Sequence, residues 1–180
     1  MKKNLKSINE LDSKTREIKN NTYKVLRKLE EESLESGYFY VQTVDSLREL
    51  THCLKFIADP VFEHIDNNHP PLLKEQIKDL HLLNEEIASL FDDILAALRK
   101  QNPKDISKIF SQQKNVLDLI ARLRKKQIRI IKEDNVSSRN AMMYLNLLSE
   151  SRNLVNYATN MVKSHYDFVV GEENRKIPYN

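Results

Sequence analysis

The chain has 180 residues, enough for one or two small domains, and 31% of them are charged while 40% are hydrophobic. Two glycines and five prolines leave few turn residues for a β-rich fold, so the composition predicts an all-α protein of long amphipathic helices. A net charge of +3 with interspersed signs argues against a dedicated nucleic-acid-binding protein. The single cysteine, Cys53, excludes an internal disulfide and fits a reducing compartment. No run of about 20 apolar residues is present to span a bilayer.

Apolar periodicity predicts a first helix over residues 3–34 and a second over 38–66. The first has a narrow seam with threonine at two positions: Ile8, Leu11, Thr15, Ile18, Thr22, Val25 and Leu29. Gly37 is expected to end this helix in the left-handed C′ conformation. The second helix has a wider apolar face: Val41, Val44, Leu47, Leu50, Leu54, Ile57, Val61 and Ile65. Pro60 is expected to kink that helix or to end it near Asp59.

Three further helices are predicted over 72–101, over 103–133, and from a polar turn at 133–138 to about Val170, with a stop at Gly171. The residues Asn102-Pro103-Lys104-Asp105 form a strong start signal for the fourth helix. The expected core positions of the third helix are Ile77, Leu80, Leu83, Ile87, Leu90, Phe91, Ile94 and Leu98. Those of the fourth are Ile106, Ile109, Phe110, Val116, Leu119, Ile120, Leu123 and Ile130. Short links, including 67–71, predict five long helices in elongated antiparallel bundles.

A faint duplication relates residues 38–66 to residues 142–170, 104 positions further along the chain. Three identities support it: Tyr40 with Tyr144, Arg48 with Arg152, and Leu50 with Leu154. A repeated helical unit indicates a repeated architecture. Each copy also has a pair of polar side chains one helical turn apart, Arg48 with His52 and Arg152 with Asn156.

Two groups of side chains are weak candidates for metal binding. Glu49 and His52 have the Glu-x-x-His spacing that di-iron bundles use twice, but only one such pair is present. A surface pair is the favoured interpretation. Glu63 and His64 form a second group with Asp66 and His69, where a solvated helix end is favoured over a ligand set.

The last turns of the fourth predicted helix are strongly basic: Arg122, Arg124, Lys125, Lys126, Arg129 and Lys132. These cations could meet an acidic partner, anionic lipid headgroups or phosphate. The favoured interpretation is simpler, because cations are stabilised near a helix C-terminus by the helix dipole. No nucleophile elbow, phosphate-binding glycine loop or zinc-ligand spacing occurs. We therefore expect neither catalysis nor a bound cofactor.

The order of these segments resembles the PhoU family. The resemblance lies in the stretch YFYVQTVDSLRELTHCLKFIADPVFEHIDNNHPPL, in the Asn-Pro-Lys-Asp turn, and in RNLVNYATNMVKSHYDFVVG. It is closest to the cytosolic C-terminal PhoU-like domain of bacterial sodium/phosphate cotransporters. The resemblance implies two tandem three-helix bundles with the first helix missing. An incomplete first bundle would then cover 1–66, a second bundle 67–171, and a tail 172–180.

Metal-binding PhoU proteins have Glu-x-x-x-Asp pairs where this chain has Arg48 and His52, then Arg152 and Asn156. A guanidinium repels a cation and an asparagine is a weak ligand, so the family's metal site is not expected here. Arg48 and Arg152 are expected either to hold an anion or, preferably, to pair with a carboxylate. The missing helix would leave apolar surface that dimerisation or a rearranged first helix would have to cover.

The resemblance implies a non-catalytic regulatory domain on the cytoplasmic side of the bacterial inner membrane. Its partner would be a transmembrane phosphate-transport domain or its own full-length chain, and phosphate would be the transported ion. Homodimerisation is left open, and no nucleic-acid partner is expected. A free-standing PhoU-type regulator of phosphate uptake and signalling is the first alternative. A metal-binding helical bundle is the second.

Overall fold

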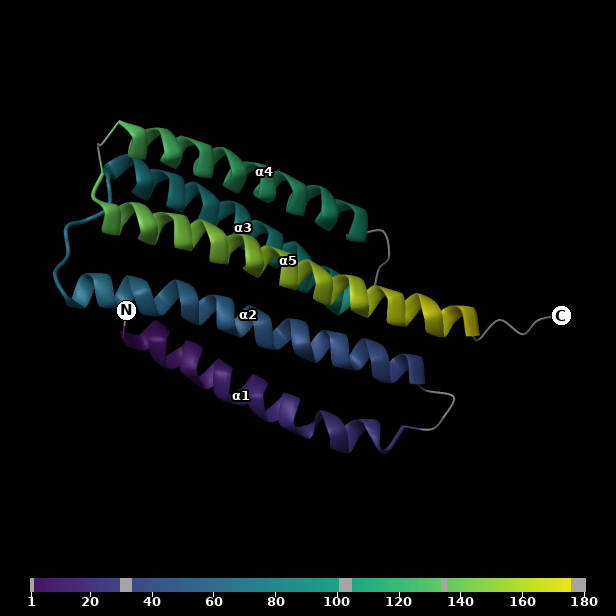
Figure 1. Ribbon diagram of the computed structural model, residues 1–180. Coiled ribbons are helices and arrows are strands. Elements are labelled where there is room, and N and C mark those ends of the chain that lie inside the picture. Colours follow the sequence, from purple (N-terminus) through teal and green to yellow (C-terminus); the bar gives the residue numbers. More distant parts are fainter. Residues whose placement is uncertain (1, 30–33, 101–104, 134–135, 176–180) are drawn as a thin grey trace.

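The computed structural model describes residues 2–29, 34–100, 105–133 and 136–175. Five long helices follow one another: α1 (Lys2–Leu26), α2 (Leu34–Asp66), α3 (Lys74–Lys100), α4 (Asp105–Lys132) and α5 (Ser138–Arg175). They lie side by side in an elongated bundle, and the described residues contain no strand (Figure 1). The prediction of an all-α helical bundle is therefore confirmed. No helix within the described ranges is long and apolar enough to cross a membrane.

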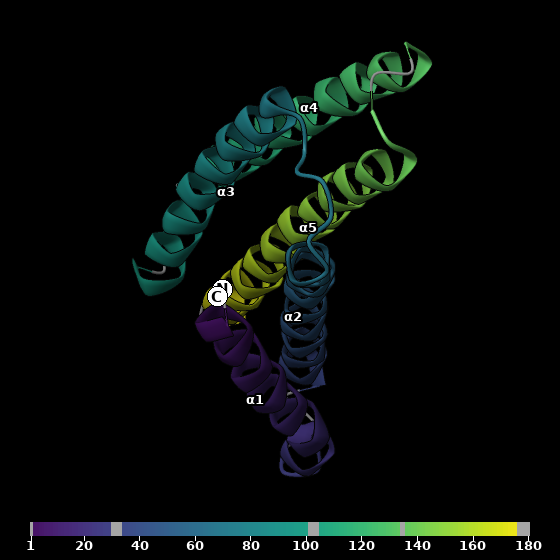
Figure 2. The ribbon, with the colours of Figure 1, turned by 90° about the vertical axis from the view of Figure 1, so that its left-hand side faces the viewer.

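From one side of the molecule to the other, the order of the helices is α1, α2, α5, and then α3 with α4. Helices α3, α4 and α5 contact one another, α2 packs along α5, and α1 contacts α2 alone among the helices (Figure 2). One core joins α2 to the three-helix unit, because Leu50 and Cys53 belong to the same buried cluster as Leu90, Ile109 and Leu148. The proposed boundary between two bundles near residue 66 stays a prediction.

The link between α1 and α2 differs from the predicted one. α1 ends at Leu26, and Gly37 lies inside α2 without a positive φ angle. A Cβ atom on Gly37 would lie 3.0 Å from Leu29 and 3.2 Å from Leu26. The glycine therefore permits close packing of the end of α1 against α2, and it does not terminate a helix.

One other predicted helix end is wrong, because α5 continues past Gly171 to Arg175. Pro60 lies inside α2 and does not end it near Asp59; the helix reaches its predicted end at Asp66, and a kink at Pro60 stays a prediction. The connector at residues 67–71 is present, with Asn68 in the left-handed region at a φ of 51°. The start signal at Asn102-Pro103-Lys104 lies outside the described residues, and Asp105 is the first residue of α4.

Several predicted core positions face solvent. Ile65 is 57% exposed, Ile77 40% and Phe110 36%, because each lies at the edge of its helix's apolar face.

The α1 seam is buried only at Thr15 and at Asp12 beside it, while three apolar seam residues remain more than a third exposed: Leu11, Ile18 and Val25. α1 has α2 as its only helical neighbour, so one flank of its seam has nothing to pack against.

The duplicated segments pack against each other. Helices α2 and α5 run antiparallel (Figure 1), with a 3.1 Å hydrogen bond between Gln42 and Ser164 and an edge-to-face contact between Phe39 and Phe168. A shift of 104 positions carries Phe39 to Met143 and Phe168 to His64. Met143 and His64 line one hollow at the other end of the helix pair. The contact between the two copies therefore has an approximate two-fold symmetry.

Candidate functional site

Arg48, the first residue of the Arg48 and His52 pair on α2, forms a buried ion pair. The Arg48 guanidinium donates to Asp12 of α1, at 2.7 Å to Oδ1 and 3.1 Å to the backbone oxygen. It also donates to Thr15 Oγ1 at 3.0 Å, and its second terminal nitrogen lies 2.7 Å from His52 Nε2. The side chains of Arg48 and Asp12 are only 9% and 10% exposed. Arg48 thus makes the carboxylate pairing that was the preferred expectation, with a partner that the sequence had not indicated.

Two further cations surround the Asp12 carboxylate. Arg16 donates to Oδ2 at 3.1 Å, and Lys55 of α2 lies 3.7 Å from the same oxygen. The hydrogen bond from Arg48 lowers the pKa of Asp12 below its ordinary value of 3.8; burial opposes this, and the charges of Lys55 and Arg16 add to it. The carboxylate is therefore held in its charged form, and it is the main polar attachment of α1 to α2.

The depressed pKa of Asp12 predicts acid-induced release of α1. Because the folded pKa lies below 3.8, the ion pair contributes fully above that pH and is lost as the pH falls through the folded value. We expect the protection factors of amide hydrogen exchange in α1, which are corrected for the intrinsic pH dependence of exchange, to fall below about pH 4, before those of the core. In Asp12→Asn, the protection factors in α1 should be low at all pH values and equal to those of wild type at the acid end. Identical acid profiles of the two proteins would contradict this assignment.

The second motif position, on α5, is neutral and more open. Arg152 is exposed and makes no ion pair with any described residue. Asn156 accepts a 3.1 Å hydrogen bond from Gln113 Nε2 of α4. The two copies of the motif thus attach the preceding helix by different chemistry, an ion pair in the first and a neutral amide bond in the second.

The weak metal candidates on α2 do not converge with other ligands. Glu49 Oε2 lies 3.7 Å from His52 Nδ1, and both side chains are about 40% exposed, at 43% and 38%. His52 already contacts the Arg48 guanidinium, which repels a cation. Within the described residues, no group of three or more His, Cys, Asp or Glu side chains is placed to hold a metal ion. Burial, and then the nearby Glu150, raise the pKa of Cys53 to about 12, which keeps this buried thiol protonated at neutral pH.

The histidines near the end of α2 have structural partners. His64 is buried, and its Nε2 donates to the Pro70 carbonyl at 2.9 Å. The His69 ring lies 5.4 Å from the His64 ring, tilted by 54°, and His69 contacts Arg139 of α5. Burial lowers the pKa of His69, and Arg139 and His64 add to the effect. Glu63 is exposed at the rim of the hollow that His64 and Met143 line. These residues fix the turn between α2 and α3, and a cation there would face Arg139.

The basic residues of α4 divide into two groups. Lys126 bridges to α3, 2.8 Å from Asp79 Oδ2 and 2.7 Å from Glu75 Oε1. Burial alone would lower the pKa of Lys126, but its bonds to these two carboxylates outweigh burial and raise it. The other candidates make no ion pair with a described residue, and all are exposed except the half-buried Arg124: Arg122, Arg124, Lys125 and Arg129.

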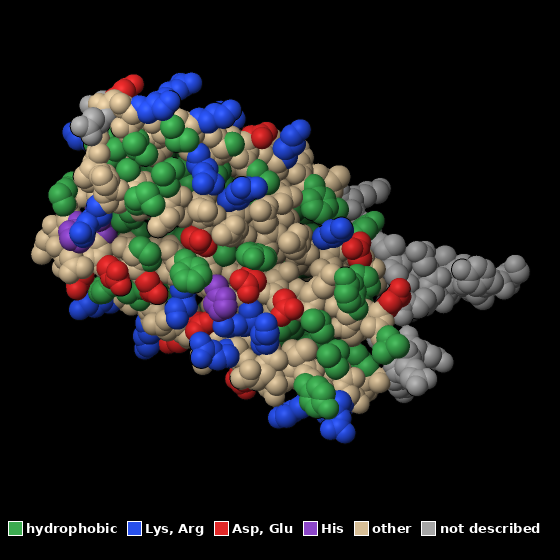
Figure 3. All heavy atoms as spheres, in the orientation of Figure 1, with side chains coloured by type: hydrophobic (Ala, Val, Ile, Leu, Met, Phe, Trp, Pro, Cys, Tyr) green, Lys and Arg blue, Asp and Glu red, His purple; other side chains and the backbone are tan. Residues whose placement is uncertain are grey.

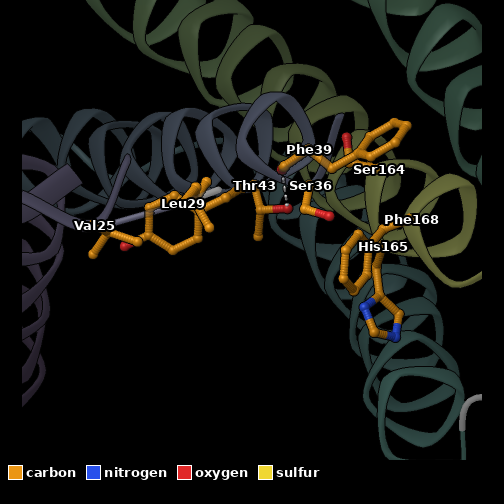
Figure 4. Close-up of a pocket in the computed structure, with 9 residues that line it drawn as sticks. Val25, Leu29, Ser36, Phe39, Thr43, Ser164, His165 and Phe168 are labelled. Atoms are coloured by element: carbon orange, nitrogen blue, oxygen red, sulfur yellow. Dashed lines mark hydrogen bonds between the residues drawn. The ribbon is translucent and has the colours of Figure 1, made fainter. Parts of the chain in front are cut away.

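An apolar groove lies between the end of α1, the start of α2 and the end of α5. Its volume is about 310 Å³. Val25 and Leu29 lie on one side, Phe168 and His165 on the other, and α2 lies between them (Figure 4). This groove was not among the sequence predictions, because its walls come from segments more than 100 residues apart and no motif marks it.

The approximate two-fold symmetry relates the groove to a surface in the other half of the chain. A shift of 104 positions carries the α2 wall of the groove, Ser36, Phe39, Tyr40 and Thr43, to Asn140, Met143, Tyr144 and Leu147 of α5. There the first turns of α3 and the turn before it bury Asn140 and Tyr144, whereas Met143 lines the hollow beside His64. Asn140 donates to the Pro71 carbonyl at 2.9 Å, and the Tyr144 hydroxyl donates to Asp79 at 3.3 Å. The α2 wall of the groove therefore corresponds in part to the surface on which α3 is seated and in part to that hollow.

No family model, curated protein or solved structure matches the chain. The PhoU-like resemblance accordingly remains a prediction.

Proposed function

We propose that this chain is a non-catalytic regulatory domain that acts through protein contacts. The open apolar groove between α1, α2 and α5 carries this proposal, because part of the matching surface in the second half is covered by a helix of the same chain. An apolar groove with few polar groups suits a helical partner. The ion-paired Arg48 supports a role in contact over metal chemistry, since its positive charge stands where a metal ligand would be needed.

The resemblance to PhoU-like domains gives the proposal its context. On that basis the chain regulates a sodium-dependent phosphate transporter from the cytoplasmic side of the membrane. The partner is the transmembrane portion of the transporter or a second copy of the chain. A free-standing regulator of phosphate uptake would use the same groove and differs only in having no transmembrane segment in its own reading frame.

Sodium-dependent uptake of radiolabelled phosphate by the host tests this function. We expect in-frame deletion of the chain to change uptake and its response to external phosphate, and the wild-type sequence to restore both. Val25→Arg, in the groove wall, should fail to restore them, whereas Tyr23→Arg, at a 68% exposed position on the same helix, should restore them. Uptake that is unaffected by deletion would refute the transport role. A stoichiometric metal in protein purified without chelator would favour the metal-binding alternative.

A further inference from the structure

The outward face of α4 combines unpaired cations with exposed isoleucines. Between Arg122 and Lys132 the sequence has six basic residues and no acidic one, with Asp118 and Glu133 outside this stretch. Lys126 alone among the six forms ion pairs within the described part of the chain. The remaining charge is therefore available to an external partner.

The helical geometry arranges these side chains in a stripe. At 3.6 residues per turn, the four exposed cations fall within an arc of about 80° on the side opposite the core: Arg122, Lys125, Arg129 and Lys132. Ile128 lies at the edge of the stripe, about 40° from Lys132 around the helix, and Ile131 lies about 60° further towards the core; they are 49% and 40% exposed. Figure 3 shows hydrophobic side chains gathered over the end of α4, bordered by Lys and Arg. We call these six residues the α4 basic face.

We propose that the α4 basic face docks on an anionic lipid surface. A row of four cations along a convex helix can meet several headgroups at once, and each cation near such a surface contributes about a factor of five in affinity. Apolar side chains at the edge of a basic helix insert at the boundary between headgroups and acyl chains. A folded acidic protein is less suited to this face. The isoleucines lie on an outer helix surface, and the apolar groove, which suits a protein partner, lies elsewhere, between α1, α2 and α5.

This surface is separate from the groove. In Figures 1 and 2, α4 and α1 lie on opposite sides of the molecule, with α5 and α2 between them. The lipid contact is thus independent of the proposed function, and each proposal is tested by its own experiment.

Co-sedimentation of the purified chain with vesicles tests the proposal. One vesicle preparation contains only phosphatidylcholine, and the other contains equal parts of phosphatidylcholine and phosphatidylglycerol. We expect at least about tenfold stronger partitioning onto the anionic vesicles, with most of it lost between about 0.1 M and 0.5 M salt. Equal partitioning onto both preparations, or no binding by wild-type protein at low salt, would overturn the proposal and leave the cations to an acidic polypeptide or to solubility.

Matched variants locate the contact. The triple replacement R122E/K125E/R129E should weaken anionic binding on the order of a hundredfold. The control K3E/K14E/K24E makes the same change in net charge on the exposed side of α1 and should lower binding far less. I128S/I131S should reduce binding while keeping its salt dependence. If the charge-reversed protein loses helicity, R122A/K125A/R129A replaces it. A control that loses as much affinity as the α4 variant would refute the assignment to this face.

Discussion

Replacing Arg48 with alanine is expected to release α1 from α2. The change leaves the Asp12 carboxylate buried without its main partner, and loss of one member of a buried ion pair costs about 3 kcal/mol. α1 has no other helical neighbour, and an isolated helix of this length is marginal in water. We therefore expect fast amide hydrogen exchange and early proteolysis throughout α1, together with a partial loss of helical circular dichroism. Protection in α3, α4 and α5 should be retained.

The duplication supplies the control for this experiment. Arg152 occupies the equivalent position, is exposed, and forms no ion pair with a described residue, so Arg152→Ala should change stability by less than about 0.5 kcal/mol. The double replacement D12L/R48M, which substitutes apolar side chains for both charges, should recover most of the docking of α1. Undiminished protection of α1 in Arg48→Ala would show that the ion pair is not the attachment.

Leu148→Ala is expected to destabilise α2 together with the three-helix unit. Leu148 is 0% exposed at the centre of the core, and truncation at such a position costs about 3–4 kcal/mol. Leu50 and Cys53 of α2 belong to the same cluster, so exchange protection in α2 and in α3–α5 should fall in parallel. The measurement is urea unfolding with hydrogen exchange read for each helix.

Met142→Ala serves as the control on the same helix, because Met142 is 58% exposed and its loss should cost less than about 0.5 kcal/mol. If α2 keeps its protection while α3–α5 lose theirs, α2 belongs to a separate folding unit. That outcome would favour the predicted division near residue 66.

The helices were predictable because their apolar residues recur with the helical period. Leu90, Ile109 and Leu119 were expected in the core and are buried there, and the short links gave the antiparallel arrangement. Gly37 was misread because a glycine that ends a helix and one that permits close packing look identical in sequence. The local signal was overridden by contact with Leu26 and Leu29.

The polar contacts could not be predicted, because they depend on distance in space and not on periodicity. Asp12 is a charged residue beside a weak seam, and nothing in the sequence indicates that Arg48, 36 positions away, reaches it. The same holds for Gln76 and Gln127, which are almost completely buried and bonded to each other at 2.8 Å across α3 and α4. Apolar patterning assigns such residues to solvent, whereas a mutual hydrogen bond makes their burial possible.

The packing of α2 on α5 is the arrangement of a symmetric homodimer contained in one chain. When a segment contacts its own copy across an approximate two-fold axis, each surface is complementary to itself, as in an isologous interface. Two separate halves would form this interface only above a threshold concentration, because association opposes dilution. Joining the copies covalently replaces that threshold with a fixed effective concentration. The contact between Phe39 and Phe168 therefore persists at any expression level, and each half is free to change its own outer surface without losing its partner.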